Sequence, residues 1–202
     1  TGTEANEGAA LLATIYTGSS EFICLRNGLH GRTKLTMSMT GIGMWRTDPN
    51  PVGGISFAPN PYCYRCPLGK TYPECDLACA NAVEDIIKTN TSGKVAAFFA
   101  EPIQGNAGII TPPPGYFQRL KVILDKYNIL LVVDEVQTGF GRTGKMFAIE
   151  NFNIVPDIMT VAKALGNGTP ISAFIATAQI ADSYVKPGAS TLGGNPVSST
   201  AA

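Results

Sequence analysis

Short apolar runs recur along the chain and alternate with segments whose apolar residues have a helical spacing. The runs lie at residues 21–25, 94–100, 129–133, 158–161 and 171–176, and several are rich in β-branched side chains, which favours strands. Apolar residues three and four positions apart predict helices over 76–88 and 116–127, the second beginning after the sequence PPPG. Strands that alternate with helices predict an α/β fold with a mostly parallel sheet and helices on both faces.

The two ends of the chain also have a helical character. TGTEANEGAALLATIY opens as an amphipathic helix, and NPVSSTAA begins on small residues that suit a further one. Because neither end carries the polar tail of a complete domain, we expect residues 1–202 to be one large domain truncated at both ends. Residues 40–75, rich in Gly, Pro and Cys, are predicted to form a long loop within it, and such loops usually have a function.

Composition narrows the class of partner. With 202 residues, 45% of them hydrophobic, the chain can bury one sizeable core. Its 15 Lys and Arg balance 15 Asp and Glu, so its net charge is zero and indicates neither nucleic acid nor an anionic membrane as a partner. No apolar run approaches the roughly 20 residues of a membrane span, and no signal-peptide pattern is present. We expect a cytoplasmic protein with a small-molecule partner.

Three stretches carry candidate chemistry. LLVVDEVQTGFGRTG places Asp134 at the end of a buried strand, where open α/β sheets bind ligands and where an anion needs a cation or a hydrogen-bond donor; capping of the next turn is the alternative. PDIMTVAKALGNG places Lys163 after another strand, in surroundings more apolar than a surface lysine normally has. TGT at residues 1–3 begins a helix, whose free N–H groups suit a phosphate.

Together these stretches resemble the class III aminotransferases, the ornithine, 4-aminobutyrate and alanine–glyoxylate type. TGTEANE, HGRT, AEPIQG, PPPGYFQRL, DEVQTGFGRTG, AKALGNG and STLGGNP match that family in order over nearly the whole chain. The resemblance implies a fold-type I transferase large domain and pyridoxal 5'-phosphate (PLP) as cofactor. It also implies transfer of an amino group between an amino acid, such as an ω-amino acid or alanine, and a 2-oxo acid.

The resemblance assigns the two catalytic residues. Lys163 matches the lysine that forms the Schiff base with PLP and then moves the substrate proton, and burial is expected to keep its amine nucleophilic. Asp134 matches the anion that faces the pyridine nitrogen, where it strengthens the ring as an electron sink.

The resemblance also implies further contacts with the cofactor. Val136 matches a residue that packs on the ring, Gln137 one that binds its phenolic oxygen, and Gly2 with Thr3 the phosphate cup. Thr191 matches a threonine that reaches a phosphate in the neighbouring subunit, so the resemblance predicts a homodimer whose sites are shared across the interface.

The segment NGLHGRT departs from the family pattern at one position. Leu29 stands where relatives carry an aromatic residue that stacks on the ring, which weakens the expected contact with PLP. His30, the only histidine, is expected to be a pocket residue near the ring. Arg32 matches a substrate-carboxylate contact in ω-amino-acid enzymes, with a surface arginine as the alternative. In relatives a glutamate at the position of Asn106 can mask a second arginine, so that substrates of different length share the site. Asn106 carries no charge and cannot act in this way, which favours alanine or pyruvate-type substrates.

Four of the five cysteines fall in PYCYRCPLGKTYPECDLACA. Cys63, Cys66, Cys75 and Cys79 have a density that suits a zinc or iron–sulfur centre, although the spacing matches no specific motif; reduced thiols or a disulfide are the alternatives. Two other functions therefore stay open. One is an inactive fragment, or a module that binds a metal or a partner. The other is a different PLP reaction on the same fold, such as that of an aminomutase, a decarboxylating transaminase or a racemase.

Overall fold

The protein is a three-layer α/β/α structure around one sheet. The computed structural model describes residues 1–202 and contains six strands in the order β2-β1-β3-β4-β5-β6. The neighbours from β2 to β5 pair in parallel, and β6 runs antiparallel to β5. The strands are β1 (Glu21–Leu25), β2 (Ile55–Ala58), β3 (Val95–Ala100), β4 (Leu130–Asp134), β5 (Ile158–Val161) and β6 (Ala173–Ala176).

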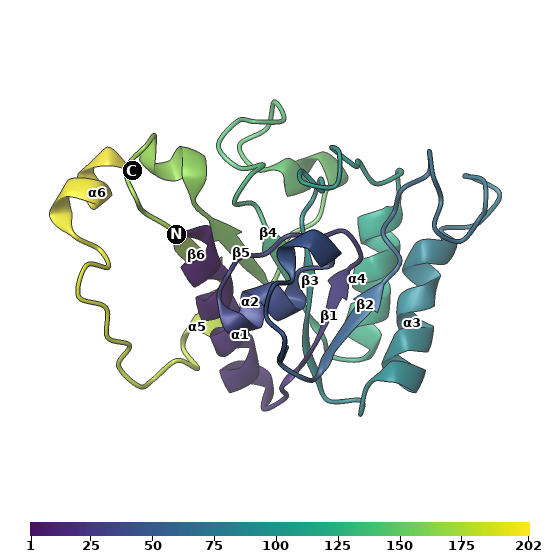
Figure 1. Cartoon of the computed structure of the whole chain (residues 1–202), viewed down its shortest axis with the longest axis horizontal. Coiled ribbons are helices and arrows are strands. Elements are labelled where there is room, and N and C mark those ends of the chain that lie inside the picture. Colours follow the sequence, from purple (N-terminus) through teal and green to yellow (C-terminus); the bar gives the residue numbers. More distant parts are fainter.

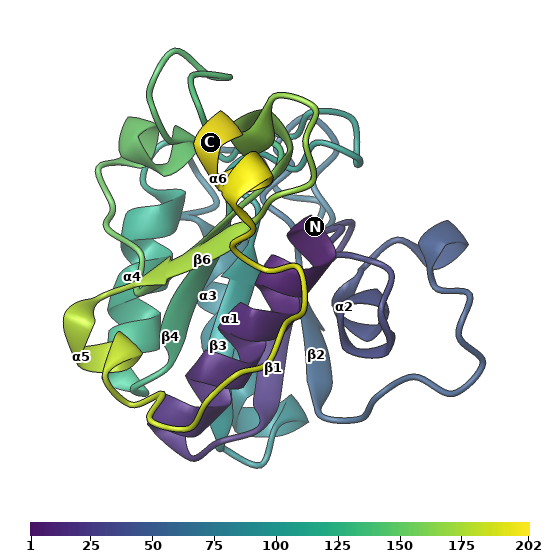
Figure 2. The same ribbon diagram turned by 90° about the vertical axis from the view of Figure 1, so that its left-hand side faces the viewer.

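Helices cover both faces of the sheet (Figure 1). One face carries α1 (Gly2–Thr17), which packs on β3 to β6, together with α2 (Lys34–Met39) and α5 (Ala178–Ala181). The opposite face carries α3 (Ala78–Asn90) and α4 (Tyr116–Lys126), which pack on each other. Figure 2 looks toward the β6 edge of the sheet, with α4 on one side of the strands and α1 and α2 on the other. The remaining elements are α6 (Pro196–Ala201) and the 3-10 helices η1 (Gly43–Trp45), η2 (Ala148–Phe152) and η3 (Lys163–Gly166).

The sheet is apolar on both faces because it lies between two layers of helices. In β4, Leu131 and Val133 point into the core under α3 and α4, whereas Leu130 and Val132 point into the core under α1. Successive residues of a strand face opposite sides, so a continuous aliphatic run is the pattern of a strand covered twice. The two cores hold the sheet rigid, and its strand ends can therefore position side chains accurately.

Local sequence explains where the main helices start and stop. α1 ends at Gly18, whose φ of 67° is the left-handed conformation that favours glycine at a helix end. α4 begins after Gly115, at the end of the PPPG motif, as the sequence predicts. Asn195 caps α6, because its side-chain oxygen accepts a hydrogen bond from the Ser198 N–H at 3.0 Å.

The five predicted strands and the predicted helices are confirmed, but the loop predicted over 40–75 is wrong in part. β2 lies inside it and pairs in parallel with β1, so that Ile55 lies beside Phe22 and Ala58 beside Leu25. The run ISFA is too short to stand out among Gly, Pro and Asn, and it becomes a strand because β1 offers it an open sheet edge. The rest of the segment contains η1 and irregular chain.

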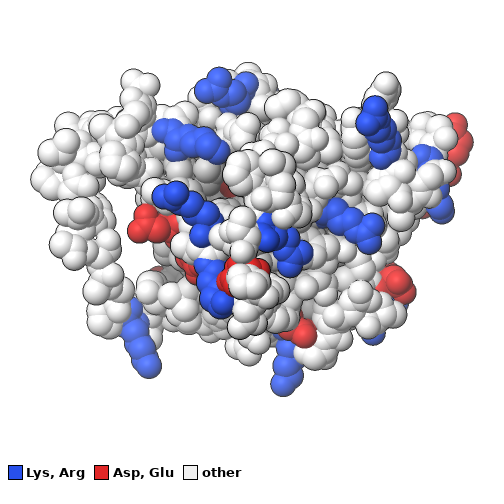
Figure 3. All heavy atoms as spheres, viewed as in Figure 1, with Lys and Arg blue, Asp and Glu red and all other residues white.

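Two surface properties bear on possible partners. None of the helices has the length and apolarity to cross a membrane. In Figure 3 the Lys and Arg side chains are dispersed over the visible face and do not form one basic patch.

Candidate active site

A cavity of about 420 Å³ lies at the carboxyl ends of β3, β4 and β5, beside the N-terminus of α1. Ligands of open α/β sheets bind at this edge, because parallel strands deliver the side chains that follow them to one place. Eight of the residues expected from the sequence line this cavity: Gly2, Thr3, Leu29, His30, Asp134, Val136, Gln137 and Lys163. Segments separated by up to 160 positions in the chain therefore converge, as the resemblance implies.

Asp134 is held in place by a complete set of hydrogen bonds. Its Oδ2 atom accepts bonds from Asn6 Nδ2 and His30 Nδ1, both at 2.8 Å, and its Oδ1 atom accepts one from the Val136 N–H at 3.1 Å. Asn6 also donates to the His30 carbonyl at 2.7 Å and accepts from Thr160 Oγ1 at 2.7 Å. Because Asp134, Asn6 and Thr160 are all buried, the carboxylate has one fixed orientation.

His30 sits between two carboxylates. Burial disfavours its protonated form, but the hydrogen bond that His30 donates to Asp134 and the charges of Asp134 and Glu101 outweigh this effect and raise the pKa of His30. The Glu101 carboxylate accepts bonds from the N–H groups of Leu29 at 2.9 Å and Gly105 at 3.0 Å, and burial raises its pKa. Glu101 therefore ties the loop that carries Leu29 to the end of β3.

The other end of the cavity is a helix N-terminus. The first helical bond of α1 runs from the Ala5 N–H to the Thr1 carbonyl at 3.1 Å, and a capping box pairs the Glu4 N–H with the Thr1 side chain, so the N–H groups of residues 2 and 3 have no partner within the helix. A Cβ at Gly2 would come within 2.6 Å of Val136 Cγ1, and one at Gly31 within 2.7 Å of Thr3 Oγ1. Both sites therefore need glycine, and the bare backbone leaves free donors for an anion.

Lys163 lies at the start of η3, directly after β5. Its φ of 43° is in the left-handed region, which is unusual for a residue other than glycine and occurs most often at functional sites. The expectation that Lys163 is buried is wrong for this chain, because the side chain is exposed.

The turn after β4 directs Gln137 toward the cavity and Glu135 away from it. A Cβ at Gly105 would meet the Gln137 amide at 2.4 Å, so glycine at 105 makes room for the side chain on the cavity wall. Glu135 points the other way: it accepts a hydrogen bond from the Thr138 hydroxyl and one from the Ile149 N–H at 2.8 Å, and it is fully buried. Of the two acids in DEVQTG, Asp134 alone lines the cavity.

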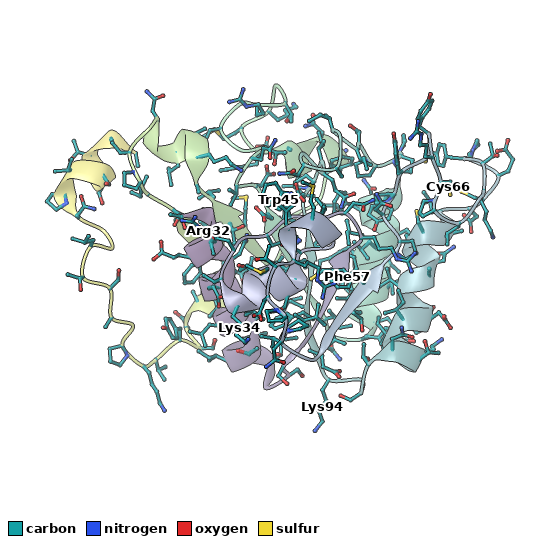
Figure 4. The ribbon with its side chains drawn as sticks, in the orientation of Figure 1. Arg32, Lys34, Trp45, Phe57, Cys66 and Lys94 are labelled. Atoms are coloured by element: carbon teal, nitrogen blue, oxygen red, sulfur yellow. The ribbon has the colours of Figure 1, made fainter.

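Two predicted contact residues do not reach the cavity. Arg32 is exposed and is absent from the lining, because the chain turns at Gly31 and continues toward α2. Figure 4 shows Arg32 on the outside of the ribbon. Thr191 is exposed on the extended segment before α6, which runs away from the sheet in Figure 1. Thus, neither side chain contributes to the cavity of its own chain.

The four clustered cysteines do not form a metal site in this structure. All five cysteines are free, and no group of three or more His, Cys, Asp or Glu side chains could hold a metal ion. Cys79 belongs to the core under α3, and burial raises its pKa to about 11, which favours the thiol over the metal-binding thiolate. Cys66 lies at the far edge of the molecule from Arg32 (Figure 4). The hypothesis of a zinc or iron–sulfur centre at Cys63, Cys66, Cys75 and Cys79 gains no support.

Sequence reasoning missed Asn6 as a site residue. It lies in the TGTEANE motif, four positions after Gly2, which puts the two residues on the same face of α1. That spacing is the signal that could have found it. Residues 168–171, which follow η3, also line the cavity and were not expected there.

The lining fits PLP. Free N–H groups at one end suit a phosphate, and a fixed carboxylate at the other suits a protonated pyridine nitrogen. The lysine amine lies on the same cavity, whose volume of about 420 Å³ falls in the range of small-molecule sites. The fold and this site are typical of the fold-type I PLP-dependent transferases.

Comparison with known proteins identifies the family. Residues 1–202 match the aminotransferase class-III family, and the chain belongs to it. Over the full chain it is 47% identical to the leucine/methionine racemase of Thermococcus litoralis, of which it covers 46%. Over 99% of the chain it is 40% identical to the mitochondrial alanine–glyoxylate aminotransferase 2 homolog 2 of Arabidopsis thaliana, of which it covers 41%. The chain thus spans about half the length of the curated relatives it matches.

A solved structure agrees with this identification. An amine transaminase from an uncultivated Pseudomonas species, in its PLP-bound form, superposes with a TM-score of 0.93 at 33% identity. The match covers 99% of this chain and 49% of that one. The fold-type I architecture predicted from the sequence is confirmed.

Proposed function

We propose that residues 1–202 form the PLP-binding large domain of an aminotransferase that moves an amino group between an amino acid and a 2-oxo acid. One observation carries this proposal: Lys163 and Asp134 line one cavity, and Asp134 is fixed there by three hydrogen bonds. Class III membership and a PLP-bound transaminase as structural neighbour support PLP as the cofactor.

Each residue has a defined task in this proposal. When bound, PLP withdraws electrons from the substrate Cα and thereby acidifies its proton. Asp134, oriented by Asn6 and His30, holds a proton on the ring nitrogen. The Lys163 amine would hold the cofactor covalently and, when free, would take the Cα proton of the substrate. The N-terminus of α1 would bind the phosphate with the N–H groups of residues 2 and 3.

The expected shape of the full site includes a second copy of the chain. Thr191 is exposed and does not line the cavity of its own chain, which fits a residue that serves a neighbouring subunit. We therefore propose a homodimer with shared sites. Sedimentation of the wild type and of Thr191→Ala, together with a PLP titration of both, tests this. The variant should remain dimeric and bind PLP more weakly, and a monomeric wild type would contradict the proposal.

The five free cysteines fit a reducing, cytoplasmic compartment, and we propose that the protein is located there. Cell fractionation tests this location.

The cofactor chemistry is tested by absorbance. The full-length protein with PLP should show the visible absorbance of lysine-bound PLP, borohydride should bleach it, and Lys163→Ala should lack it. Addition of alanine should then convert the bound cofactor to its amine form and release pyruvate in equal amount. A wild type that binds no PLP would leave the inactive-fragment hypothesis as the better one.

The racemase relative favours a second candidate function. The Thermococcus litoralis protein, 47% identical over the whole chain, is named a leucine/methionine racemase. Racemisation returns the proton to the opposite face of Cα and consumes no oxo acid. Of the titratable groups on the cavity, His30 and Asp134 bond each other and Glu101 binds backbone, so Lys163 is the one free proton carrier. Chiral chromatography of L-leucine incubated without oxo acid decides: formation of D-leucine without 2-oxo acid would favour the racemase.

A further inference from the structure

The dipeptide Asn-Gly occurs twice in the chain, at Asn27–Gly28 and at Asn167–Gly168. At this dipeptide the backbone attacks its own side chain most readily, because glycine has no Cβ to hinder its amide nitrogen. Both asparagines are exposed, and both have a left-handed backbone, with φ values of 63° and 44°. The two sites therefore match in sequence and in the conformation of the asparagine, and they differ in what surrounds the glycine.

Gly28 is held in place by packed chain. Its N–H donates a hydrogen bond to the Leu25 carbonyl at 3.1 Å. The residue is buried, and a Cβ placed on it would lie 3.1 Å from that carbonyl oxygen and 3.2 Å from His30 Nε2. Attack by the Gly28 nitrogen on the Asn27 side chain would break this hydrogen bond and displace buried atoms. The fold therefore protects Asn27.

Gly168, in contrast, lies in an open turn. The residues on either side of it close the turn: the Asn167 N–H donates to the Ala164 carbonyl at 3.2 Å, and the Thr169 N–H donates to the Gly166 carbonyl at 2.9 Å. None of the hydrogen bonds of this turn uses the Gly168 N–H. Gly168 is exposed, and a Cβ placed on it would have no atom within 4 Å. The peptide group between residues 167 and 168 can therefore rotate toward the Asn167 side chain without displacing packed atoms.

The reaction that this turn permits needs only water. The Gly168 nitrogen loses its proton to solvent base and attacks Cγ of Asn167. The new N–Cγ bond closes a succinimide ring, and the Cγ–Nδ2 bond breaks with release of ammonia. Water then opens the ring at either of its carbonyls, which gives aspartate or isoaspartate, the isomer whose backbone runs through Cγ. In total, asparagine and water become an acidic residue and ammonia, and the chain gains a negative charge.

The position of the turn gives this modification a consequence. Gly168 and Thr169 line the cavity of about 420 Å³ that Lys163 also lines. Asn167 directly precedes them and ends η3, the 3-10 helix that begins at Lys163. A carboxylate at residue 167 would add negative charge beside a cavity whose other end offers N–H groups to an anion. The longer backbone of isoaspartate would also shift the lining residues that follow it.

We propose that Asn167–Gly168 is a site of spontaneous succinimide formation, at which the chain acquires aspartate or isoaspartate on the rim of the cavity. The fold selects this site over Asn27–Gly28, although the two dipeptides are identical. The inference does not depend on the proposed function, because the reaction takes place within the chain and requires no cofactor.

Ageing of the full-length protein tests the proposal. The protein is incubated at neutral and at mildly alkaline pH and then digested, and mass spectrometry quantifies conversion at residues 27 and 167. An isoaspartate-specific methyltransferase reports the isomer. Residue 167 should convert about tenfold faster than residue 27, since the hydrogen bond and the packing of Gly28 raise the barrier there. Conversion should be faster at the higher pH and should yield isoaspartate. Unchanged Asn167, equal rates at the two sites, or aspartate without isoaspartate would overturn the proposal.

Two variants and an unfolded control separate the fold from the sequence. Asn167→Gly and Asn27→Gly each remove one amide, and glycine accepts the left-handed φ of both positions. On isoelectric focusing, aged wild type and Asn27→Gly should gain the same acidic form, whereas Asn167→Gly should lack it; an equal amount of this form in Asn167→Gly would contradict the assignment. In urea the two sites of the wild type should convert at similar rates, because the Gly28 hydrogen bond is lost. A preference for residue 167 that persisted in urea would show that sequence, and not the fold, selects the site.

Discussion

Replacement of Asn6 by leucine would test how strongly the site depends on its buried polar chain. Asn6 is 1% exposed and joins Thr160, the His30 carbonyl and Asp134 through bonds of 2.7, 2.7 and 2.8 Å. Leucine has nearly the same shape, so the change removes hydrogen bonds and leaves no large cavity. The Thr160 hydroxyl and the His30 carbonyl would then be buried without these partners.

The expected loss of stability follows from those groups. A buried polar group left without its partner costs about 1–3 kcal/mol, so two of them give a loss of about 3–4 kcal/mol in the free energy of unfolding. Thr160→Val alone should cost about 1–2 kcal/mol, because it leaves one acceptor, Asn6 Oδ1, unpaired. Both changes remove the hydrogen bond between Thr160 and Asn6. The Asn6→Leu, Thr160→Val double variant should therefore lose about 1 kcal/mol less than the sum of the two single losses.

Urea unfolding of the PLP-free full-length protein at equilibrium measures these differences. Asn81→Ala provides the control, because Asn81 also lies on a helix but is exposed, and its loss should stay within about 1 kcal/mol. An Asn6→Leu variant as stable as the wild type, or strictly additive losses in the double variant, would refute the reasoning.

Three further changes probe the same cavity. Because the pKa of His30 is raised above 6.5, protonated His30 stabilises the fold below pH 6.5, and this contribution disappears as the pH rises through the folded pKa. His30→Gln should therefore flatten the fall of the urea midpoint as the pH rises above 6.5, and an unchanged pH profile would contradict this. In Gly105→Ala, the added Cβ would lie 2.4 Å from the Gln137 amide and should displace that side chain. The PLP dissociation constant should rise about tenfold, with little loss of stability. Gly43→Ala is the matched control, because a Cβ at residue 43 would have no atom within 4 Å. Leu29→Tyr should tighten PLP binding about fivefold, the value of roughly 1 kcal/mol of aromatic stacking, and a titration showing weaker binding would argue against a ring beside residue 29.

Much of the architecture could be predicted from local patterns. Each run that lies between two helical layers is apolar on both faces, and β4 is the clearest example, because LLVV supplies side chains to both cores. Strand β2 could not be predicted in this way, since ISFA is short and becomes a strand only beside β1. Pairing partners lie far apart in the chain, so a short edge strand leaves almost no local signal.

The sequence by itself determined the residue types of the site and their place at strand ends. DEVQTG after an aliphatic run, and a lysine after the next strand, predict Asp134 and Lys163 at one edge of the sheet, since parallel strands end together. The helix start at Gly2 likewise predicts an anion-binding end.

Tertiary structure alone decided which of these groups touch. It turned Asp134 into the cavity and Glu135 away from it, brought Asn6 to the carboxylate and left Arg32 outside. Local pattern limits a side chain to a face or an end of an element. Its partners and its exposure depend on how the elements pack, which is a property of the whole chain.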